Sequence, residues 1–217
     1  MYMILQDGFQ YKLKSDRAIL VSGPTPTEIS HGYYTIPEKI HGRPVLEIKD
    51  AAFMNSEIKS LKLPSCIKHI GKRAFKDSKI QEISFFECEA SNILKLDSCA
   101  FDGCEHLMSF KTEQVVIAEY FSFAHCPNLT EFYAHFQCIN PEAFAYSGIT
   151  SIDMTDNCRI KARSLDNSQI KEIHLKNSAT FAQRILEWIR QNNINVYVAT
   201  GSPLLDMVHL GHTVFEE

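Results

Sequence analysis

Residues 73–85 read Arg-Ala-Phe-Lys-Asp-Ser-Lys-Ile-Gln-Glu-Ile-Ser-Phe, and five other segments repeat this pattern. The copies are AAFMNSEIKSLKL (51–63), CAFDGCEHLMSFKT (99–112), FSFAHCPNLTEFYA (121–134), EAFAYSGITSIDM (142–154) and RSLDNSQIKEIHL (163–175). Their aromatic or leucine residues lie 22, 26, 22, 21 and 21 residues apart, at Phe53, Phe75, Phe101, Phe123, Phe144 and Leu165. A period near twenty is typical of a solenoid, because so short a unit buries its apolar face only against its neighbours.

Each position of the repeat has a structural reading. We expect the aromatic residue to end a short helical or 3₁₀ segment and to fill the interior of the coil. Three residues later stands a small residue, at Ser56, Ser78, Cys104, Cys126, Ser147 and Ser168. Copies in successive coils should stack there, about one strand spacing (~4.8 Å) apart. A short strand follows with inward apolar pairs, at Ile58/Leu61, Ile80/Ile83, Leu107/Phe110, Leu129/Phe132, Ile149/Ile152 and Ile170/Ile173. Upstream pairs predict a second strand per coil, at Val45/Ile48, Ile67/Ile70, Leu94/Leu96 and Val115/Ile117, giving parallel ribbons.

The segment Ile70-Gly71-Lys72-Arg73-Ala74-Phe75-Lys76-Asp77-Ser78 resembles the BspA-like leucine-rich repeat family, whose units run roughly I-G-x-x-A-F-x-x-C-x-x-L-x-x-I-x-I-P. Leu63-Pro64 matches the end of that unit, and residues 34–45 resemble the opening unit of the family. The resemblance implies an α/β solenoid: a right-handed coil of about six to seven turns, with short parallel strands and short helical or 3₁₀ segments, capped at both ends. Only two units keep the closing proline, so we expect less regular curvature in the second half.

We expect three segments, which are an N-terminal β cap (1–33), the BspA-like repeats (34–176) and a C-terminal α/β cap (177–217). The first cap reads as a β-meander around Asp7-Gly8 and Ser15-Asp16. In the last, a helix over 178–192 is followed by a strand over 194–199 and a short helix from Ser202-Pro203. The first helix would place four apolar residues on one face, at Phe181, Ile185, Trp188 and Ile189.

Composition excludes some function classes. The formal net charge is −4, and lysine and arginine are scattered, so we expect no nucleic-acid binding, which needs a basic stripe. No apolar run of 18 residues is present, so no membrane span is predicted. Seven cysteines without disulfide-scaffold spacing, and no signal-peptide pattern at the N-terminus, favour reduced thiols and an intracellular chain. The family resemblance favours instead a secreted or cell-surface protein whose leader has been removed.

No catalytic, cofactor or metal site is predicted. Five residues resemble metal ligands, at Cys99, Cys104, His106, His125 and Cys126. Cys104 and Cys126 occupy the small stacking position, however, and the two histidines lie on opposite sides of it, so the five should not converge on one ion. The linear motifs of common hydrolases, phosphate-binding loops and zinc enzymes are missing, which favours a protein that is not an enzyme. Catalytic groups drawn from several coils would leave no such motif.

The outward strand positions form the candidate binding surface. Two residues after the first apolar residue of each strand stand Ser60, Glu82, Ser109, Glu131, Ser151 and Glu172. Two residues later stand Lys62, Ser84, Lys111, Tyr133, Asp153 and His174. The later copies are acidic and include one aromatic anchor. The predicted partner-binding patch is therefore Glu131, Tyr133, Asp153, Glu172 and His174, and it would favour a protein partner with a basic surface.

Three functional hypotheses follow. The first is a non-enzymatic protein-binding module that presents its strand face, for which the resemblance implies protein–protein interaction or attachment at a cell surface. The second is an intracellular scaffold or self-associating structural protein that uses the exposed ends of the solenoid. The third is an enzyme with residues from several coils, which requires a pocket lined by groups with shifted pKa values.

Overall fold

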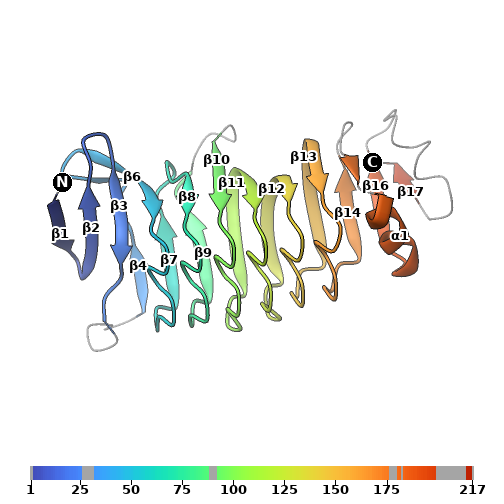
Figure 1. The fold of residues 1–217 in the computed structure, drawn as a ribbon, viewed down its shortest axis with the longest axis horizontal. Helices are drawn as coiled ribbons and strands as arrows, with labels where there is room; N and C mark the ends of the chain where they lie inside the picture. The colour runs from blue at the N-terminus through green and yellow to red at the C-terminus, as the bar shows by residue number, and fades with distance from the viewer. Residues whose placement is uncertain are drawn as a thin grey trace.

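The computed structural model describes residues 2–25, 32–87, 92–175, 180–181, 183–198 and 214–216. Within these ranges the chain winds into an elongated β-solenoid, with β1 (Tyr2–Gln6) and β17 (Val214–Glu216) at opposite ends of the coil axis (Figure 1). Successive coils follow one another along this axis in chain order, so most contacts join one coil to the next.

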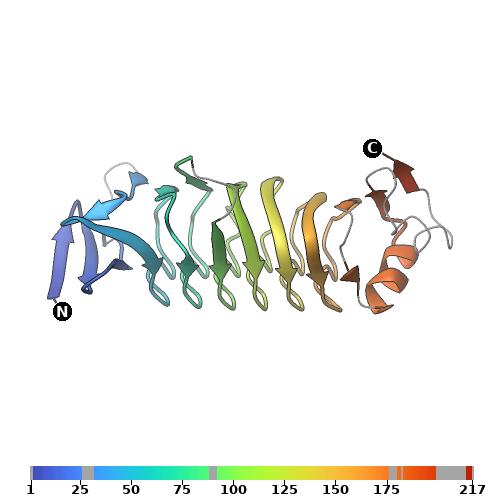
Figure 2. The same ribbon diagram turned by 90° about the horizontal axis from the view of Figure 1, so that it is seen from above.

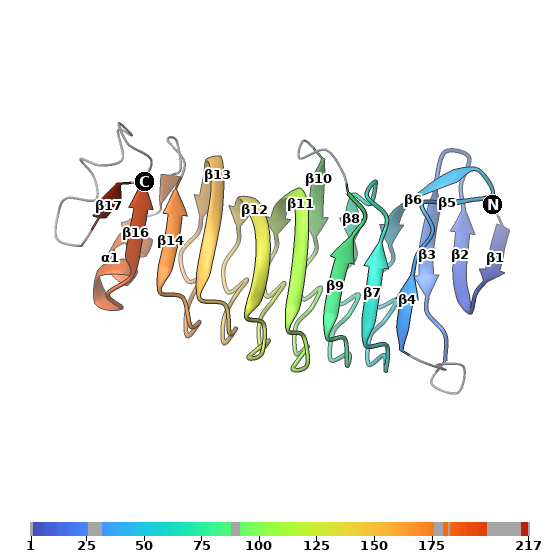
Figure 3. The same ribbon diagram turned by 180° about the vertical axis from the view of Figure 1, so that it is seen from behind.

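Two rows of parallel strands run along the coil. The first row, seen from behind in Figure 3, comprises β4 (Tyr33–Thr35), β7 (Ser60–Leu63), β9 (Glu82–Phe85), β11 (Ser109–Ala118), β12 (Glu131–Ile139), β13 (Ser151–Ile160), β14 (Glu172–Leu175), β16 (Asn195–Val198) and β17. The second row comprises β3 (Ala18–Ser22), β6 (Arg43–Ile48), β8 (His69–Ile70), β10 (Ile93–Leu96), the C-terminal parts of β11, β12 and β13, and β15 (Thr180–Phe181). The two predicted strands per coil are thus present in the repeats. Figure 2 shows the two rows from above, with the turns that join them.

The segments around the aromatic residues are hydrogen-bonded turns, and the predicted helical or 3₁₀ segments are not found there. Every second N–H closes a turn within its own coil, as when Lys76 donates to Arg73 O at 3.2 Å. The intervening N–H groups bond to the next coil, as when Phe75 donates to Ala100 O at 2.7 Å. Residues two before and two after the aromatic, such as Arg73 (φ 57°) and Asp77 (φ 56°), adopt left-handed backbone conformations. A helix would use all its N–H groups within one coil, so the stacking of coils excludes it.

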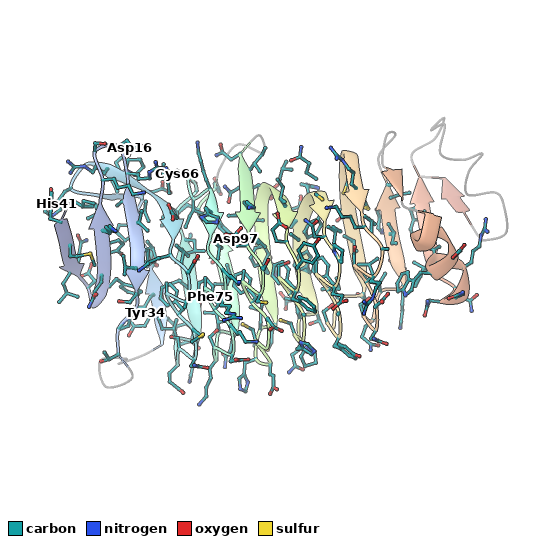
Figure 4. The ribbon with its side chains drawn as sticks, in the orientation of Figure 1. Asp16, Tyr34, His41, Cys66, Phe75 and Asp97 are labelled. Atoms are coloured by element: carbon teal, nitrogen blue, oxygen red, sulfur yellow. The ribbon has the colours of Figure 1, made fainter. Side chains whose placement is uncertain are left out.

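A column of stacked phenylalanines forms the core, as the repeat predicted. Phe75 and Phe101 are fully buried, and their ring centroids lie 4.9 Å apart with an interplanar angle of 5°. Equivalent stacking joins Phe53 to Phe75, at 4.8 Å, and continues from Phe101 through Phe123 to Phe144. Figure 4 labels Phe75 in this interior position. The register inferred from sequence is therefore confirmed for these coils.

The small residue three positions after each aromatic residue also lies in the core, as Cys104 and Cys126 show. The buried thiols of Cys104 and Cys126 donate hydrogen bonds to the backbone carbonyls of Phe75 (2.9 Å) and Phe101 (3.1 Å) in the preceding coils. Each of these carbonyls also accepts a backbone N–H of its own coil, from Ser78 (3.0 Å) and Cys104 (3.2 Å), so the thiol donates to its second lone pair. Burial, followed by the hydrogen bond with Cys104, raises the pKa of Cys126. The two cysteines therefore have a structural role.

Gly71 lies where the backbones of two coils approach each other closely. A Cβ atom at this position would lie 2.6 Å from the backbone nitrogen of Asp50 and 2.8 Å from the carbonyl carbon of Lys49. The Gly71 N–H donates to Ile48 O at 2.9 Å, which holds the two coils at this separation. A side chain at residue 71 would therefore collide with the backbone of the preceding coil.

The two ends of the solenoid differ from the repeats. β1, β2 (Phe9–Leu13) and β3 form antiparallel hairpins, and β5 (Lys39–Ile40) pairs antiparallel with β6. Phe9 packs edge-on against Phe53 at 6.3 Å, beside the end of the phenylalanine column. At the other end, α1 (Gln183–Gln191) is shorter than the predicted helix. Phe181 lies in β15, outside α1, whereas Trp188 and Ile189 pack against the core as expected. The helix expected from Ser202-Pro203 lies outside the described residues, and the division into caps at 33 and 177 stays a prediction.

Candidate functional site

The outward side chains of the first strand row form a continuous surface, which we call the strand face. Parallel register aligns Lys62 with Ser84, Ser84 with Lys111, and Lys111 with Tyr133. The neighbouring line aligns Ser60, Glu82, Ser109 and Glu131 in the same way. As far as β12, the strand face therefore has the alignment that the repeat predicted.

Between β12 and β13 the alignment changes. β13 pairs Asp153 with His135, two residues further along β12 than Tyr133, which the repeat had placed beside Asp153. The strands also differ at the corner between the two rows. Lys111 and Val115 of β11 pair with Tyr133 and His135 of β12, so β12 has two fewer residues there than β11. A shift of two residues keeps the inward and outward faces but changes every lateral neighbour.

The five predicted partner-binding residues consequently divide into two groups. Glu131 and Tyr133 lie beside β11, whereas Asp153, Glu172 and His174 lie together on β13 and β14. Asp153 aligns with His174, and the His174 imidazole Nε2 lies 3.9 Å from Glu172 Oε2. The Asp153 carboxylate is still close enough to raise the pKa of Tyr133, so the two groups adjoin on one face.

Glu131 is paired within the chain. The Lys111 ammonium donates to Glu131 Oε2 at 2.5 Å, and both side chains are more than half exposed. Such an exposed ion pair contributes little to stability, about 0–1 kcal/mol, but it neutralises the charge of Glu131 locally. Glu131 therefore adds less negative potential to the strand face than the sequence suggested.

Tyr133 lies in an acidic, aromatic environment. Its ring is 40% exposed and packs edge-on against His135, with centroids 5.3 Å apart. Its hydroxyl donates to Glu113 Oε2 at 3.5 Å and lies 3.3 Å from His135 Nε2. Partial burial, together with the negative charges of Glu113 and Asp153, raises the pKa of Tyr133. Burial is the largest cause of this shift, and the two carboxylates add to it because they disfavour a negative charge on the phenol.

A small cavity opens beside Tyr133. It has a volume of about 200 Å³ and is lined by Ser84, Phe85, Phe86, Glu87, Lys111, Thr112, Glu113 and Tyr133. The Lys62 ammonium lies 4.5 Å from the centre of the Phe86 ring, a cation–π contact. One lysine of this face is therefore held against an aromatic ring of the neighbouring strand segment.

His135 and Tyr197 belong to the strand face but were missed by the sequence reading. His135 lies beyond the part of the repeat taken as the outward strand, and Tyr197 belongs to β16, which was read as part of a cap. β16 pairs with β14 so that Tyr197 aligns with His174, and the two rings stack at 4.6 Å with an interplanar angle of 9°. The alternation of polar and apolar residues in Asn195–Val198 could have identified Tyr197 as an outward residue. No sequence pattern indicates that the corner between the strand rows places His135 on the strand face.

The residues considered as metal ligands do not gather in one place. His125 Nδ1 lies 2.9 Å from Asp102 Oδ1, and its ring stacks on Tyr146 at the turn edge. His106 is exposed on the turn, while Cys104 and Cys126 are committed to backbone carbonyls in the core. Throughout the described ranges, no group of three or more His, Cys, Asp or Glu residues is arranged to hold a metal ion. Likewise, no helix in the described part of the chain is long and apolar enough to cross a membrane.

Comparison with known proteins agrees with the repeat. The model of the BspA type leucine rich repeat region matches residues 84–188 with six copies. A leucine rich cell surface protein from Faecalibacterium prausnitzii A2-165 is similar in structure, with 20% identity over 83% of this chain and 50% of its own, and a TM-score of 0.65. The T. pallidum leucine rich repeat protein is 14% identical over 99% of this chain and 98% of its own, with a TM-score of 0.55.

At these identities the likeness to both structures concerns the fold. The chain spans half the length of the F. prausnitzii protein, and a search of curated proteins finds no match. The matched repeats, the spacing of the phenylalanines and the solenoid all agree with the resemblance drawn from the sequence. Residues 84–188 are therefore similar to the BspA type leucine rich repeat region, and the described residues fold as a solenoid like those of bacterial leucine-rich repeat proteins.

Proposed function

We propose that this chain is a non-enzymatic protein-binding module that engages its partner through the strand face. The observation that carries the proposal is the open surface around Tyr133, where an exposed aromatic ring, a cavity and the carboxylates of Glu113 and Asp153 lie together. Leucine-rich repeat proteins generally serve as protein-interaction modules, and a solenoid suits this role because it presents one long regular surface.

The proposed partner carries basic side chains. A lysine or arginine entering beside Tyr133 would meet the face of an aromatic ring and the nearby carboxylate of Glu113. Asp153 and Glu172 extend the acidic character along the adjacent strands. Aromatic anchors within a partly desolvated centre contribute most of the energy in protein interfaces, whereas peripheral charges mainly increase the association rate.

The proposal that catalysis is absent is supported by the repeat, because leucine-rich repeat solenoids typically serve as binding modules. Attachment at a cell surface is part of the proposal, because the similar F. prausnitzii protein is described as a cell surface protein.

Binding should be tested with two substitutions and two matched controls. Tyr133→Ala removes the aromatic anchor, and Asp153→Lys reverses a charge on the same face. Tyr120→Ala removes a similarly exposed tyrosine (46%) from the turn edge, and Glu105→Lys makes the same charge change on an exposed turn residue.

The four variants and the wild type would be used to capture proteins from cell extracts and from extracellular proteins, and each captured partner would be titrated. We expect Tyr133→Ala to weaken binding by about 2 kcal/mol, near thirtyfold, as is typical of an interface hot spot. The control variants should bind like the wild type. Equal loss in Tyr133→Ala and Tyr120→Ala, or no loss in either, would place the binding surface elsewhere.

A second candidate function, self-association through the end of the solenoid, is favoured by β1. Within the described residues β1 pairs with β2 alone, and Tyr2, Met3 and Leu5 are exposed on it. An apolar strand edge of this kind pairs readily with another strand. Sedimentation over a range of concentrations tests it: a monomer at all concentrations contradicts self-association, and a dimer lost in Leu5→Lys supports it.

A further inference from the structure

A cationic cavity lies at the hairpin that joins β2 to β3, on different strands from the strand face. It has a volume of about 530 Å³, within the range of small-molecule sites, and is lined by Tyr2, Leu13, Lys14, Ser15, Asp16, Arg17 and Arg43. Figure 4 labels Asp16 at the tip of this hairpin. The lining residues come from three strands and one tight turn, so the cavity is built by the fold of the N-terminal end.

Hydrogen bonds to the backbone fix the turn of this cavity and bring Arg43 to it. The Lys14 N–H donates to Arg17 O at 2.9 Å, which closes the turn between β2 and β3. Arg43, from β6, reaches the same turn and donates from Nε to Ser15 O at 3.4 Å. Lys14, Arg17 and Arg43 are all partly buried. Three cations from two separate segments therefore converge on one cavity.

The cavity carries an excess of two positive charges, because the three cations are opposed by the single carboxylate of Asp16. This excess occurs on a chain whose formal net charge is −4. Asp16 Oδ1 lies 3.5 Å from Arg17 Nε, but the two atoms make no hydrogen bond. Arg17 Nε is shielded from solvent and has no hydrogen-bond partner among the described residues. A buried donor of this kind requires an acceptor, and an anion supplies one.

We propose that this cavity binds a dianionic oxyanion, namely a phosphate or sulfate group. The two guanidinium groups provide the planar pairs of donors that recognise such oxygens, and Lys14 adds a point charge. The charge of a phosphate monoester near neutral pH equals the excess of two in the cavity. Tyr2, half exposed at its edge, offers a ring against which an organic ester of the anion would pack. This site is independent of the proposed function of the strand face.

The test is calorimetric titration of the full chain at low, constant ionic strength with four probes. Inorganic phosphate and inorganic sulfate test the dianion, acetate tests a single charge, and phenyl phosphate tests an aromatic ester. We expect phosphate and sulfate to bind more tightly than acetate. Phosphate binding should weaken between pH 7.5 and pH 5.5, because the phosphate dianion takes up a proton within this range, whereas sulfate binding should not change over it.

Tighter binding of phenyl phosphate than of inorganic phosphate would identify an organic ester as the ligand, and equal binding would identify the free anion. Arg17→Gln and Arg43→Gln should each weaken phosphate binding about tenfold, the loss expected for one charge-assisted hydrogen bond. Arg73→Gln, an exposed arginine on the turn edge, makes the same change of charge and should have no effect. Acetate binding as tightly as phosphate, or an equal effect of Arg73→Gln and Arg17→Gln, would overturn the proposal, as would the lack of any binding.

Discussion

Replacement of Phe101 by alanine tests whether the phenylalanine column holds the coils together. The side chain is fully buried and stacks on Phe75 at 4.9 Å and on Phe123 at 5.1 Å, with Phe110 edge-on at 5.7 Å. Truncation of a buried phenylalanine costs about 3–5 kcal/mol, and each aromatic pair contributes about 0.5–1.5 kcal/mol beyond its buried area. With three ring partners, we expect Phe101→Ala to cost about 5 kcal/mol, at the upper end of the range.

Two further variants separate the causes of this loss. Phe101→Leu restores most of the buried volume but none of the ring stacking, and Leu165 shows that the coil accepts leucine at this position. We expect it to cost about 1–2 kcal/mol. Tyr146→Ala removes a ring that stacks on His125 but is 55% exposed, and it should cost less than about 1 kcal/mol, because little area is buried.

Urea unfolding followed by circular dichroism measures the three changes. With a slope near 2–3 kcal/mol/M, a loss of 5 kcal/mol lowers the midpoint by about 2 M. A cost below about 2 kcal/mol for Phe101→Ala would refute the view that the column is the main core. If Phe101→Leu were as damaging as Phe101→Ala, ring stacking would outweigh buried volume, contrary to the estimate above. A change in slope would indicate that the coils no longer unfold as one unit.

Three other substitutions test single features of the coil. Gly71→Ala should lower the urea midpoint strongly, because its Cβ would lie 2.6 Å from the backbone nitrogen of Asp50; an unchanged midpoint would contradict the close approach of the coils. Gln114→Leu should cost about 1–3 kcal/mol, since buried Gln114 donates to Ile67 O at 2.7 Å and leucine leaves that carbonyl unpaired. Burial, reinforced by a nearby carboxylate, raises the pKa of Cys66 to about 11, so folding favours the neutral thiol, and stability should fall as pH rises from 9 through 11. Cys66→Ala should reduce this alkaline loss in urea midpoints at pH 8 and pH 10.5, and an equal loss in both proteins would refute the assignment.

The core was predictable because the same apolar positions recur in every repeat. Phe75, Phe101 and their copies recur with a small residue before them and a strand after them, so the errors of any one unit are averaged out. The helical segments were predicted wrongly for a related reason. A run such as Ala-Phe-Lys-Asp-Ser has no local feature that excludes a helical turn. The helix is excluded only because alternate N–H groups donate to backbone carbonyls of the next coil.

The strand face was predictable only in part. The lines through Lys111, Tyr133 and Glu131 follow from repeats of nearly equal length, and the structure has them as expected. The pairing of Asp153 with His135 depends on how many residues each strand uses to cross the corner between the two rows. That number of residues reflects packing between coils, and the sequence of β12 contains no pattern that predicts it.

The sequence by itself determined the repeat, the stacked aromatic core, the two strands per coil and the outward direction of the candidate residues. These properties depend on periodicity, and each coil needs the same apolar positions to bury its interior. The tertiary structure alone decided which outward residues are neighbours, that Glu131 is neutralised by Lys111, and that Lys14, Arg17 and Arg43 share a cavity. Those facts depend on register and on contacts between segments distant in the chain, which a linear pattern does not encode, because each arises only when one coil is placed against another.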